Sequence, residues 1–185
     1  MSGPDGPGAR ATQIATDRLL LRRLTLAEAR AVVTLERDGR RWAADYPTEG
    51  DLVVAGIAVE AGEHYDETGD FGVYQVLLDG TGEVVGGIGF IHPPEAGAAE
   101  VGYGLAESAR GRGLATEALR AVVARAAELG VRTVVAMTAV DNVASQRVLE
   151  RLGFRLLAAV VEDDEDGPMY RWELAIGQEP QPDPA

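Results

Sequence analysis

Residues 108–119 combine glycine, arginine and the start of a helical pattern in a way that favours binding of a phosphate group. A run typical of a strand, 100–105, precedes the turn, and apolar residues recur at three- and four-residue steps after it. The first turn of a helix exposes unpaired N–H groups and carries a partial positive charge. Glycines let the backbone approach an anion closely, and Arg110 and Arg112 add positive charge. The stretch therefore predicts a phosphate-binding turn.

Two familiar phosphate-binding motifs do not fit this turn. No Gly-Lys-Ser/Thr follows the glycines, so the stretch is not a Walker P-loop. The dinucleotide pattern Gly-x-Gly-x-x-Gly also fails, because the segment that begins at Gly111 ends in Thr116.

The composition narrows the partners and the chemistry. The formal charge of −13 argues against nucleic-acid and anionic-membrane partners and suits a cationic one. There is no cysteine and there are only two histidines, which speaks against a cysteine nucleophile or a zinc site. The sequence has neither a signal-peptide layout nor an apolar run of about 18 residues, so a cytoplasmic protein is expected.

The order of predicted elements indicates an α/β fold with a mixed sheet. Residues 1–12 and 177–185 are expected to be disordered tails, and 13–176 a single domain. Thr25 and Glu28 form a capping-box pattern for a helix ending near Asp38–Gly39, and Asp51 is expected to cap a second helix. Six to seven strands with helices on both faces follow from the order β-α-α-β-β-β-α-β-α-β-β. The predicted strands are 16–24, 71–78, 83–91, 100–105, 132–140, 154–161 and 169–174.

Several segments resemble the GNAT superfamily of acyl-CoA N-acyltransferases over about residues 16–174. Arg110 to Ala115 resembles the pyrophosphate signature Gln/Arg-x-x-Gly-x-Gly/Ala. The segments 16–22 and 100–103 look like strands of the branch that contains the bacterial ribosomal-protein N-acetyltransferases. Asn142 to Arg147, followed by Leu152-Gly153-Phe154, resembles the family's Asn-x-x-Ser/Ala segment and its close.

The resemblance implies the GNAT fold and acetyl-CoA as co-substrate. In this family the fourth and fifth strands separate near a bulge, and the freed backbone bonds the pantetheine arm like an added strand. The implied pantetheine contacts are Tyr103, Gly104, Leu105 and Ala106, with Asn142 and Ser145 beside the arm and the thioester. The pyrophosphate would rest on Arg110, Gly111, Arg112, Gly113, Leu114, Ala115 and Thr116, and Arg147 is either a CoA phosphate contact or a solvated helix residue.

The resemblance departs at the catalytic acid. Many relatives carry a tyrosine seven residues after the asparagine, where this chain has Leu149. Ser145, one helical turn earlier, is the nearest polar substitute and is predicted to steady the leaving thiolate.

Glu100 is the candidate general base, acting through water, although a solvated carboxylate fits the position equally well. His92 is the next candidate, with a structural role as the alternative, and His64 is expected at the surface. The loop aromatics Trp42 and Tyr46 either line the acceptor cleft or pack on the core.

The predicted function is transfer of an acetyl group from acetyl-CoA to a primary amine by direct attack in a ternary complex. At pH 7, deprotonating a lysine-type amine costs about 4.6 kcal/mol and an α-amine only about 1, which favours a peptide N-terminus over other small amines. The acidic run 162–166 is expected near the acceptor entrance. The alternatives are a catalytically weak CoA-binding regulatory module and an N-acetyltransferase that acts on a small molecule such as a polyamine or an aminoglycoside. The chain is expected to be a monomer or a homodimer.

Overall fold

The computed structural model describes residues 13–37, 39–163 and 167–177. The predicted N-terminal tail and nearly all of the C-terminal one lie outside these residues, as do residues 164–166 of the acidic run. The strands are β1 (Gln13–Ala15), β2 (Leu19–Arg23), β3 (Val73–Leu78), β4 (Val84–Phe90), β5 (Ala98–Leu105), β6 (Thr133–Ala139), β7 (Arg155–Asp163) and β8 (Gly167–Ala175). The α-helices are α1 (Leu26–Thr34), α2 (Glu49–Ala61), α3 (Leu114–Glu128) and α4 (Val143–Arg151), with 3-10 turns η1 (Gly62–Thr68) and η2 (Glu107–Ala109).

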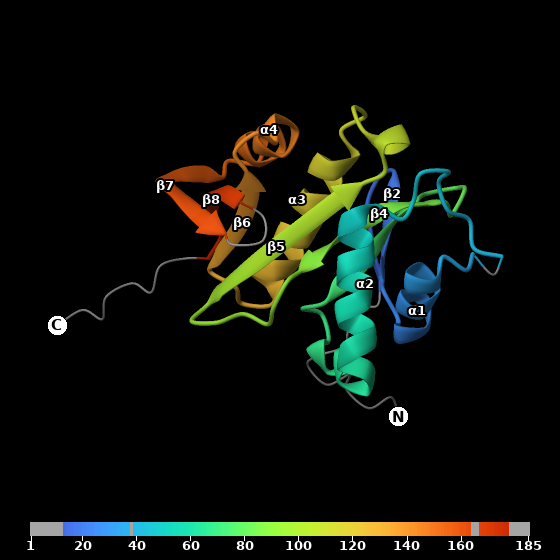
Figure 1. Ribbon diagram of the computed structural model, residues 1–185. Helices are drawn as coiled ribbons and strands as arrows, with labels where there is room; N and C mark the ends of the chain where they lie inside the picture. Colours follow the sequence, from blue (N-terminus) through green and yellow to red (C-terminus); the bar gives the residue numbers. More distant parts are fainter. Residues whose placement is uncertain (1–12, 38, 164–166, 178–185) are drawn as a thin grey trace, which may run out of the picture.

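All eight strands form one sheet in the order β1-β2-β3-β4-β5-β6-β8-β7 (Figure 1). Neighbouring strands are antiparallel except β5 and β6, which are parallel. The prediction of a mixed sheet is confirmed, but the predicted number of six to seven strands was too low. The extra strand is β1: the Thr16 amide donates to the Leu19 carbonyl at 2.9 Å, which turns the chain back so that β1 pairs with β2.

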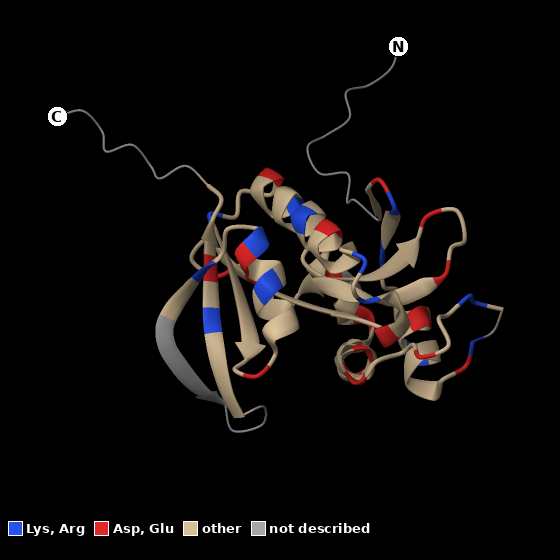
Figure 2. Cartoon of the chain, turned by 90° about the horizontal axis from the view of Figure 1, so that it is seen from above, with Lys and Arg blue, Asp and Glu red and all other residues tan. Residues whose placement is uncertain are grey.

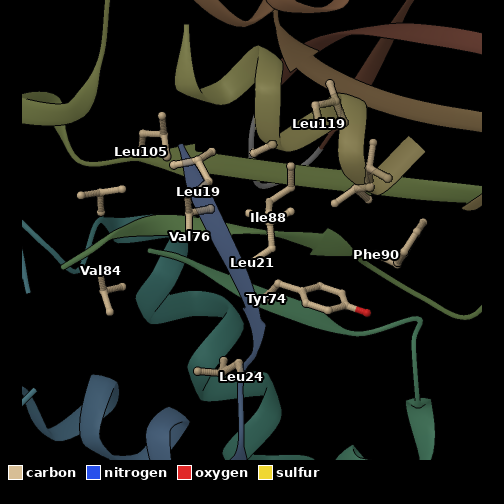
Figure 3. Close-up of a cluster of buried hydrophobic side chains, with 14 of the residues drawn as sticks. Leu19, Leu21, Leu24, Tyr74, Val76, Val84, Ile88, Phe90, Leu105 and Leu119 are labelled. Carbon is tan, nitrogen blue, oxygen red and sulfur yellow. The ribbon is translucent and has the colours of Figure 1, made fainter. Parts of the chain in front are cut away.

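Helices cover both faces of the sheet, as predicted. In Figure 1, α2 lies in front of the sheet with α1 beside it, and α3 runs behind. Figure 3 shows Leu19, Leu21 and Ile88 between the sheet and Leu119 of α3. These four side chains are at most 1% exposed, so the main core lies on the α3 side of the sheet. No helix in the described ranges is both long enough and apolar enough to cross a bilayer.

Two helix boundaries differ from the prediction. The capping box of Thr25 and Glu28 is confirmed, but α1 ends at Thr34 because Leu35 adopts a left-handed conformation and closes the helix. Helix α2 begins at Glu49 with Thr48 as its N-cap, so Asp51 is the third helical residue rather than the cap. The cap hydroxyl precedes the carboxylate by three residues, which is the spacing of a second capping box.

The ends of several elements meet at the edge of the sheet where β5 and β6 end. Within the described residues, parallel pairing of β5 with β6 runs only from Ala98–Thr133 to Val101–Ala136, although both strands continue. The two strands therefore separate, as the resemblance implies. Helices α3 and α4 begin after β5 and β6, so both helix N-termini lie at this edge, because the two strands are parallel.

Candidate active site

The glycine turn before α3 presents backbone amides with no side chain capping them. Gly113 is the N-cap residue of α3, with φ +77° and no side-chain cap. The Glu117 amide donates to the Gly113 carbonyl at 3.1 Å, and this is the first backbone hydrogen bond at the N-terminus of α3 in the described structure. The amides of Leu114, Ala115 and Thr116 precede it and are available for an anion. The buried Thr116 hydroxyl also has no partner among the described residues, which suits a ligand with acceptor oxygens.

The two arginines of the turn differ in their surroundings. Both are exposed. The Arg110 Nε donates to the Leu105 carbonyl at 2.9 Å, so this side chain links the turn to the end of β5. The Arg112 carbonyl accepts a bond of 3.0 Å from the Arg18 guanidinium. Arg110 therefore helps to shape the turn as well as charging it.

The end of β5 borders the space opened by the separation from β6. In the described sheet, Tyr103, Gly104 and Leu105 pair with β4 on one side and lie beyond the last β6 pair on the other. The Ala106 amide donates to the Val85 carbonyl at 2.8 Å. Val85 is an extra residue in β4, because Val76 pairs with Gly86 while Leu77 pairs with Val84. The backbone of Tyr103 to Ala106, called here the predicted pantetheine strip, is thus placed where it could bond the pantetheine arm, and that role stays a prediction.

The start of α4 lies beside β5. The Asn142 side chain caps α4 by accepting a bond of 3.1 Å from the Ser145 amide. The Tyr103 hydroxyl donates to the Ser145 carbonyl at 3.2 Å. Burial raises the pKa of Tyr103 to about 12, so its hydroxyl stays protonated at neutral pH. Arg147 is exposed. The structure thus brings Tyr103, Asn142 and Ser145 together.

Leu149, which stands where many relatives have a tyrosine, is 0% exposed. Its side chain belongs to the apolar core cluster. An apolar residue suits this position, so a proton donor for the leaving thiolate must come from another residue of the site.

A cavity of about 460 Å³ lies on the α2 side of the sheet. Its walls come from β3, β4, β5, α1, α2 and the loop before α2. Gly102, Tyr103 and Gly104 line it, so it reaches the predicted pantetheine strip. Its volume is that of an ordinary small-ligand pocket.

The polar groups of the cavity are Tyr46, Glu49, Asp51 and Gln75. Gln75 is 2% exposed and donates from Nε2 to the Tyr46 hydroxyl at 3.3 Å. Arg22 donates to Gln75 Oε1 at 3.2 Å. Burial first, and then the Asp51 charge, raise the pKa of Tyr46. The cavity therefore presents a fixed neutral phenol beside a carboxylate.

The other predicted candidates lie apart from this cavity. Glu100 is half-buried in β5, opposite Val135 of β6, and is not among the residues that line it. His92 and His64 are exposed and do not line it either. Of the two aromatics, Tyr46 lines the cavity, while Trp42 packs edge-on against the Tyr46 ring, with the two ring centroids 5.3 Å apart. The role of Glu100 as base stays a prediction.

Sequence reasoning missed two features of the site. The sequence predicts Asp51 only as a helix cap, and the position of α2 over the sheet is what places it in the cavity. Glu117, in the first turn of α3, accepts bonds from Thr16 and Arg18. In the sequence, Glu117 stands out only as an acidic residue in the first turn of a helix. Its partners lie 99 and 101 residues away along the chain, so no local pattern identifies them. No group of three or more His, Cys, Asp or Glu side chains suited to a metal is found in the described part of the chain.

Comparisons with known proteins agree with this geometry. A family model described as an acetyltransferase (GNAT) domain matches residues 18–155. No curated protein matches the sequence. Among solved structures, a protein described as a GNAT-family acetyltransferase from Bordetella pertussis is 29% identical, with a TM-score of 0.65, and the match covers 88% of this chain and 99% of that one.

Two further solved structures share the fold. An acetyltransferase from Agrobacterium tumefaciens is 27% identical, with a TM-score of 0.62 and coverage of 91% and 98%. RimL, a ribosomal L7/L12 alpha-N-protein acetyltransferase solved with coenzyme A, is 22% identical, with a TM-score of 0.65 and coverage of 89% and 98%. The chain belongs to the GNAT family and is an N-acetyltransferase that uses acetyl-CoA as its co-substrate.

Proposed function

We propose that the protein transfers the acetyl group of acetyl-CoA to an α-amine, such as a peptide N-terminus, by direct attack in a ternary complex. The observation that carries the proposal is that the cavity shares Tyr103 and Gly104 with the predicted pantetheine strip. An amine held there lies next to the thioester, and no covalent enzyme intermediate is needed.

The preference for an α-amine rests on the cost of removing its proton. The neutral amine is the nucleophile, and at pH 7 this cost is about 3.6 kcal/mol lower for an α-amine than for a lysine-type amine. RimL carries an alpha-N-protein activity in its name, but at 22% identity it supports the fold and not the acceptor.

A CoA-binding regulatory module is the second candidate function. The observation that favours it is Leu149, since the buried leucine supplies no proton to a leaving thiolate. Both functions use the same glycine turn, so cofactor binding alone does not separate them.

The test is release of free CoA thiol from acetyl-CoA in the presence of single amines. The panel contains leucinamide, a short peptide with a free N-terminus, spermidine and kanamycin, with a no-amine reaction as background. We expect the two α-amines to give the highest kcat/KM. Binding of CoA without thiol release above background for any amine would favour the regulatory module.

A further inference from the structure

One carboxylate oxygen in the cavity is left for a ligand. Asp51 Oδ2 accepts two bonds from the N-cap residue, one from the Thr48 amide at 2.9 Å and one from the Thr48 hydroxyl at 2.6 Å. Asp51 Oδ1 has no hydrogen-bond partner among the described residues, and it lies 2.6 Å from where a Cβ of Gly87 would stand. The carboxylate therefore rests on the bare backbone of β4, with one oxygen available.

The position of Asp51 relative to the predicted thioester follows from the strand register. Gly87 pairs directly with Gly104 in the predicted pantetheine strip. Directly paired Cα atoms lie about 4.5–5.5 Å apart, so Asp51 is about one strand spacing from that strip. Glu100 lies four residues before Gly104 along β5, which is about 13 Å in a strand. Of the two carboxylates, Asp51 is the nearer to Gly104 of this strip.

The remaining walls of the cavity indicate the chemical character of the rest of the acceptor molecule. Apart from the polar groups at Tyr46, Gln75 and Glu49, the cavity is bounded largely by glycines and apolar side chains. The Tyr46 hydroxyl accepts from Gln75 and keeps a second lone pair for another donor. A ligand that suits this cavity carries an ammonium group at one end and an apolar group at the other. The apolar side chains are Leu24, Val32, Val53, Val54, Val73 and Ile91.

We propose that Asp51 binds the ammonium group of the acceptor and takes its proton, and that the acceptor is a compact amine with an apolar body. This inference rests on the proposed acetyl transfer, and it gives Asp51 the role that the sequence assigned to Glu100. The cavity volume of about 460 Å³ suits a small molecule or a terminal residue with an apolar side chain.

The proton balance is complete without a further reactant. The acceptor enters as R–NH3+ and gives one proton to the Asp51 carboxylate, which leaves a neutral amine. Its lone pair attacks the thioester carbon, the C–N bond forms and the C–S bond breaks. A second proton passes from nitrogen to the departing sulfur, which yields the acetamide and CoA thiol, and Asp51 then releases its proton to water.

The surroundings of Asp51 suit a proton acceptor. Burial raises the pKa of Asp51, although the bonds from Thr48 oppose this. A raised pKa brings a carboxylate closer to the pH at which it accepts protons efficiently. The titratable and charged groups that face it are Tyr46 from the loop before α2 and Glu49 on α2. The Arg22–Glu28 ion pair lies next, because Arg22 donates to Gln75, which donates to Tyr46.

Binding tests the ammonium site without requiring turnover. The probes are leucinamide and 4-methylpentanamide, which has the same skeleton without the amine, titrated by calorimetry at pH 6.5 with saturating CoA. We expect the wild type to bind leucinamide at least about tenfold more tightly than 4-methylpentanamide, because the ammonium group adds a charge-assisted hydrogen bond. Asp51→Asn keeps an oxygen for Thr48 and should abolish the preference. Equal preference in wild type and Asp51→Asn would overturn the inference.

Turnover tests the proton transfer. Asp51→Asn should lower kcat/KM for leucinamide at least about tenfold and remove the acidic limb of its pH profile. The control Glu60→Gln removes the same charge from an exposed position on α2 and should stay within about twofold of wild type. Gly87→Ala keeps every polar group but fills the space of Oδ1, so it should reproduce the defect even if Asp51→Asn folds poorly.

The outcomes separate this inference from the proposed function. Acetylation of amines at wild-type kcat/KM by both Asp51→Asn and Gly87→Ala would overturn the role of Asp51 and leave the acetyl transfer standing. Loss of the acidic limb in Glu100→Gln, with the limb intact in Asp51→Asn, would return the role to Glu100. An Asp51-dependent preference in binding with no acetylation of any amine would uphold the ammonium site and contradict the proposed function.

Discussion

The Arg18 guanidinium forms an ion pair with Glu117 and so ties the start of β2 to the first turn of α3. Arg18 Nε donates to Glu117 Oε2 at 2.7 Å, and the Arg18 amide donates to Oε1 at 2.9 Å. The Thr16 hydroxyl adds a bond of 2.6 Å to Oε1. The same guanidinium donates to the Arg112 carbonyl at 3.0 Å, so it also links the phosphate turn to the start of β2.

Loss of the Arg18 side chain should therefore loosen the turn. We expect Arg18→Ala to raise the Kd for CoA about threefold to tenfold, because a half-exposed ion pair and one hydrogen bond to a carbonyl are modest contributions. Calorimetry of CoA binding measures this. Arg120→Ala, which removes an exposed arginine from α3, is the control. An equal effect in both variants would point to net charge rather than to the contacts of Arg18 with Glu117 and Arg112.

Glu117 should make stability depend on pH in the acidic range. Burial raises the pKa of Glu117, but the bonds from Thr16 and Arg18 outweigh it and hold the pKa below its ordinary value of 4.5. The folded protein then binds this proton less readily than the unfolded chain, so the stabilisation is full above about pH 4.5 and declines as the pH falls further. Glu117→Gln should lower Tm at pH 7, and its Tm should approach that of the wild type as the pH falls below about 4.5. A Tm difference that stays constant down to pH 3.5 would contradict this.

The two ends of α3 offer a matched test of the phosphate turn. Gly113 and Gly130 have φ of +77° and +82°, and a Cβ at either meets little or nothing. Alanine at each site should cost a similar 1–2 kcal/mol or so of stability, from backbone strain alone. We expect only Gly113→Ala to weaken CoA binding, by about tenfold or more. Equal CoA affinity in the two variants, measured with both folded, would place the pyrophosphate elsewhere.

Ser145 should affect the chemical step more than cofactor binding. Its amide is used by the Asn142 cap and its carbonyl by Tyr103, so alanine keeps both backbone contacts. We expect Ser145→Ala to lower kcat about tenfold or more if its hydroxyl steadies the thiolate, with an unchanged Kd for CoA. Near wild-type kcat would leave the Tyr103 hydroxyl as the next group to vary, through Tyr103→Phe.

The sequence by itself determined the features that depend on neighbouring residues. The capping box of Thr25 and Glu28, the glycine turn that opens α3 and the order of the predicted strands and helices all follow from local spacing. These signals are local because caps and turns use hydrogen bonds between residues a few positions apart. The family resemblance added acetyl-CoA, and the family match confirms it.

The tertiary structure alone decided which of the candidate groups meet. Asp51 reaches the cavity because α2 packs over Gly87, and Glu117 reaches Arg18 because α3 packs beside β2. Strand register sets Glu100 apart from the end of β5, and core packing buries Leu149. Contacts of this kind join residues tens of positions apart, and they are fixed by register and by side-chain packing, neither of which local sequence patterns specify.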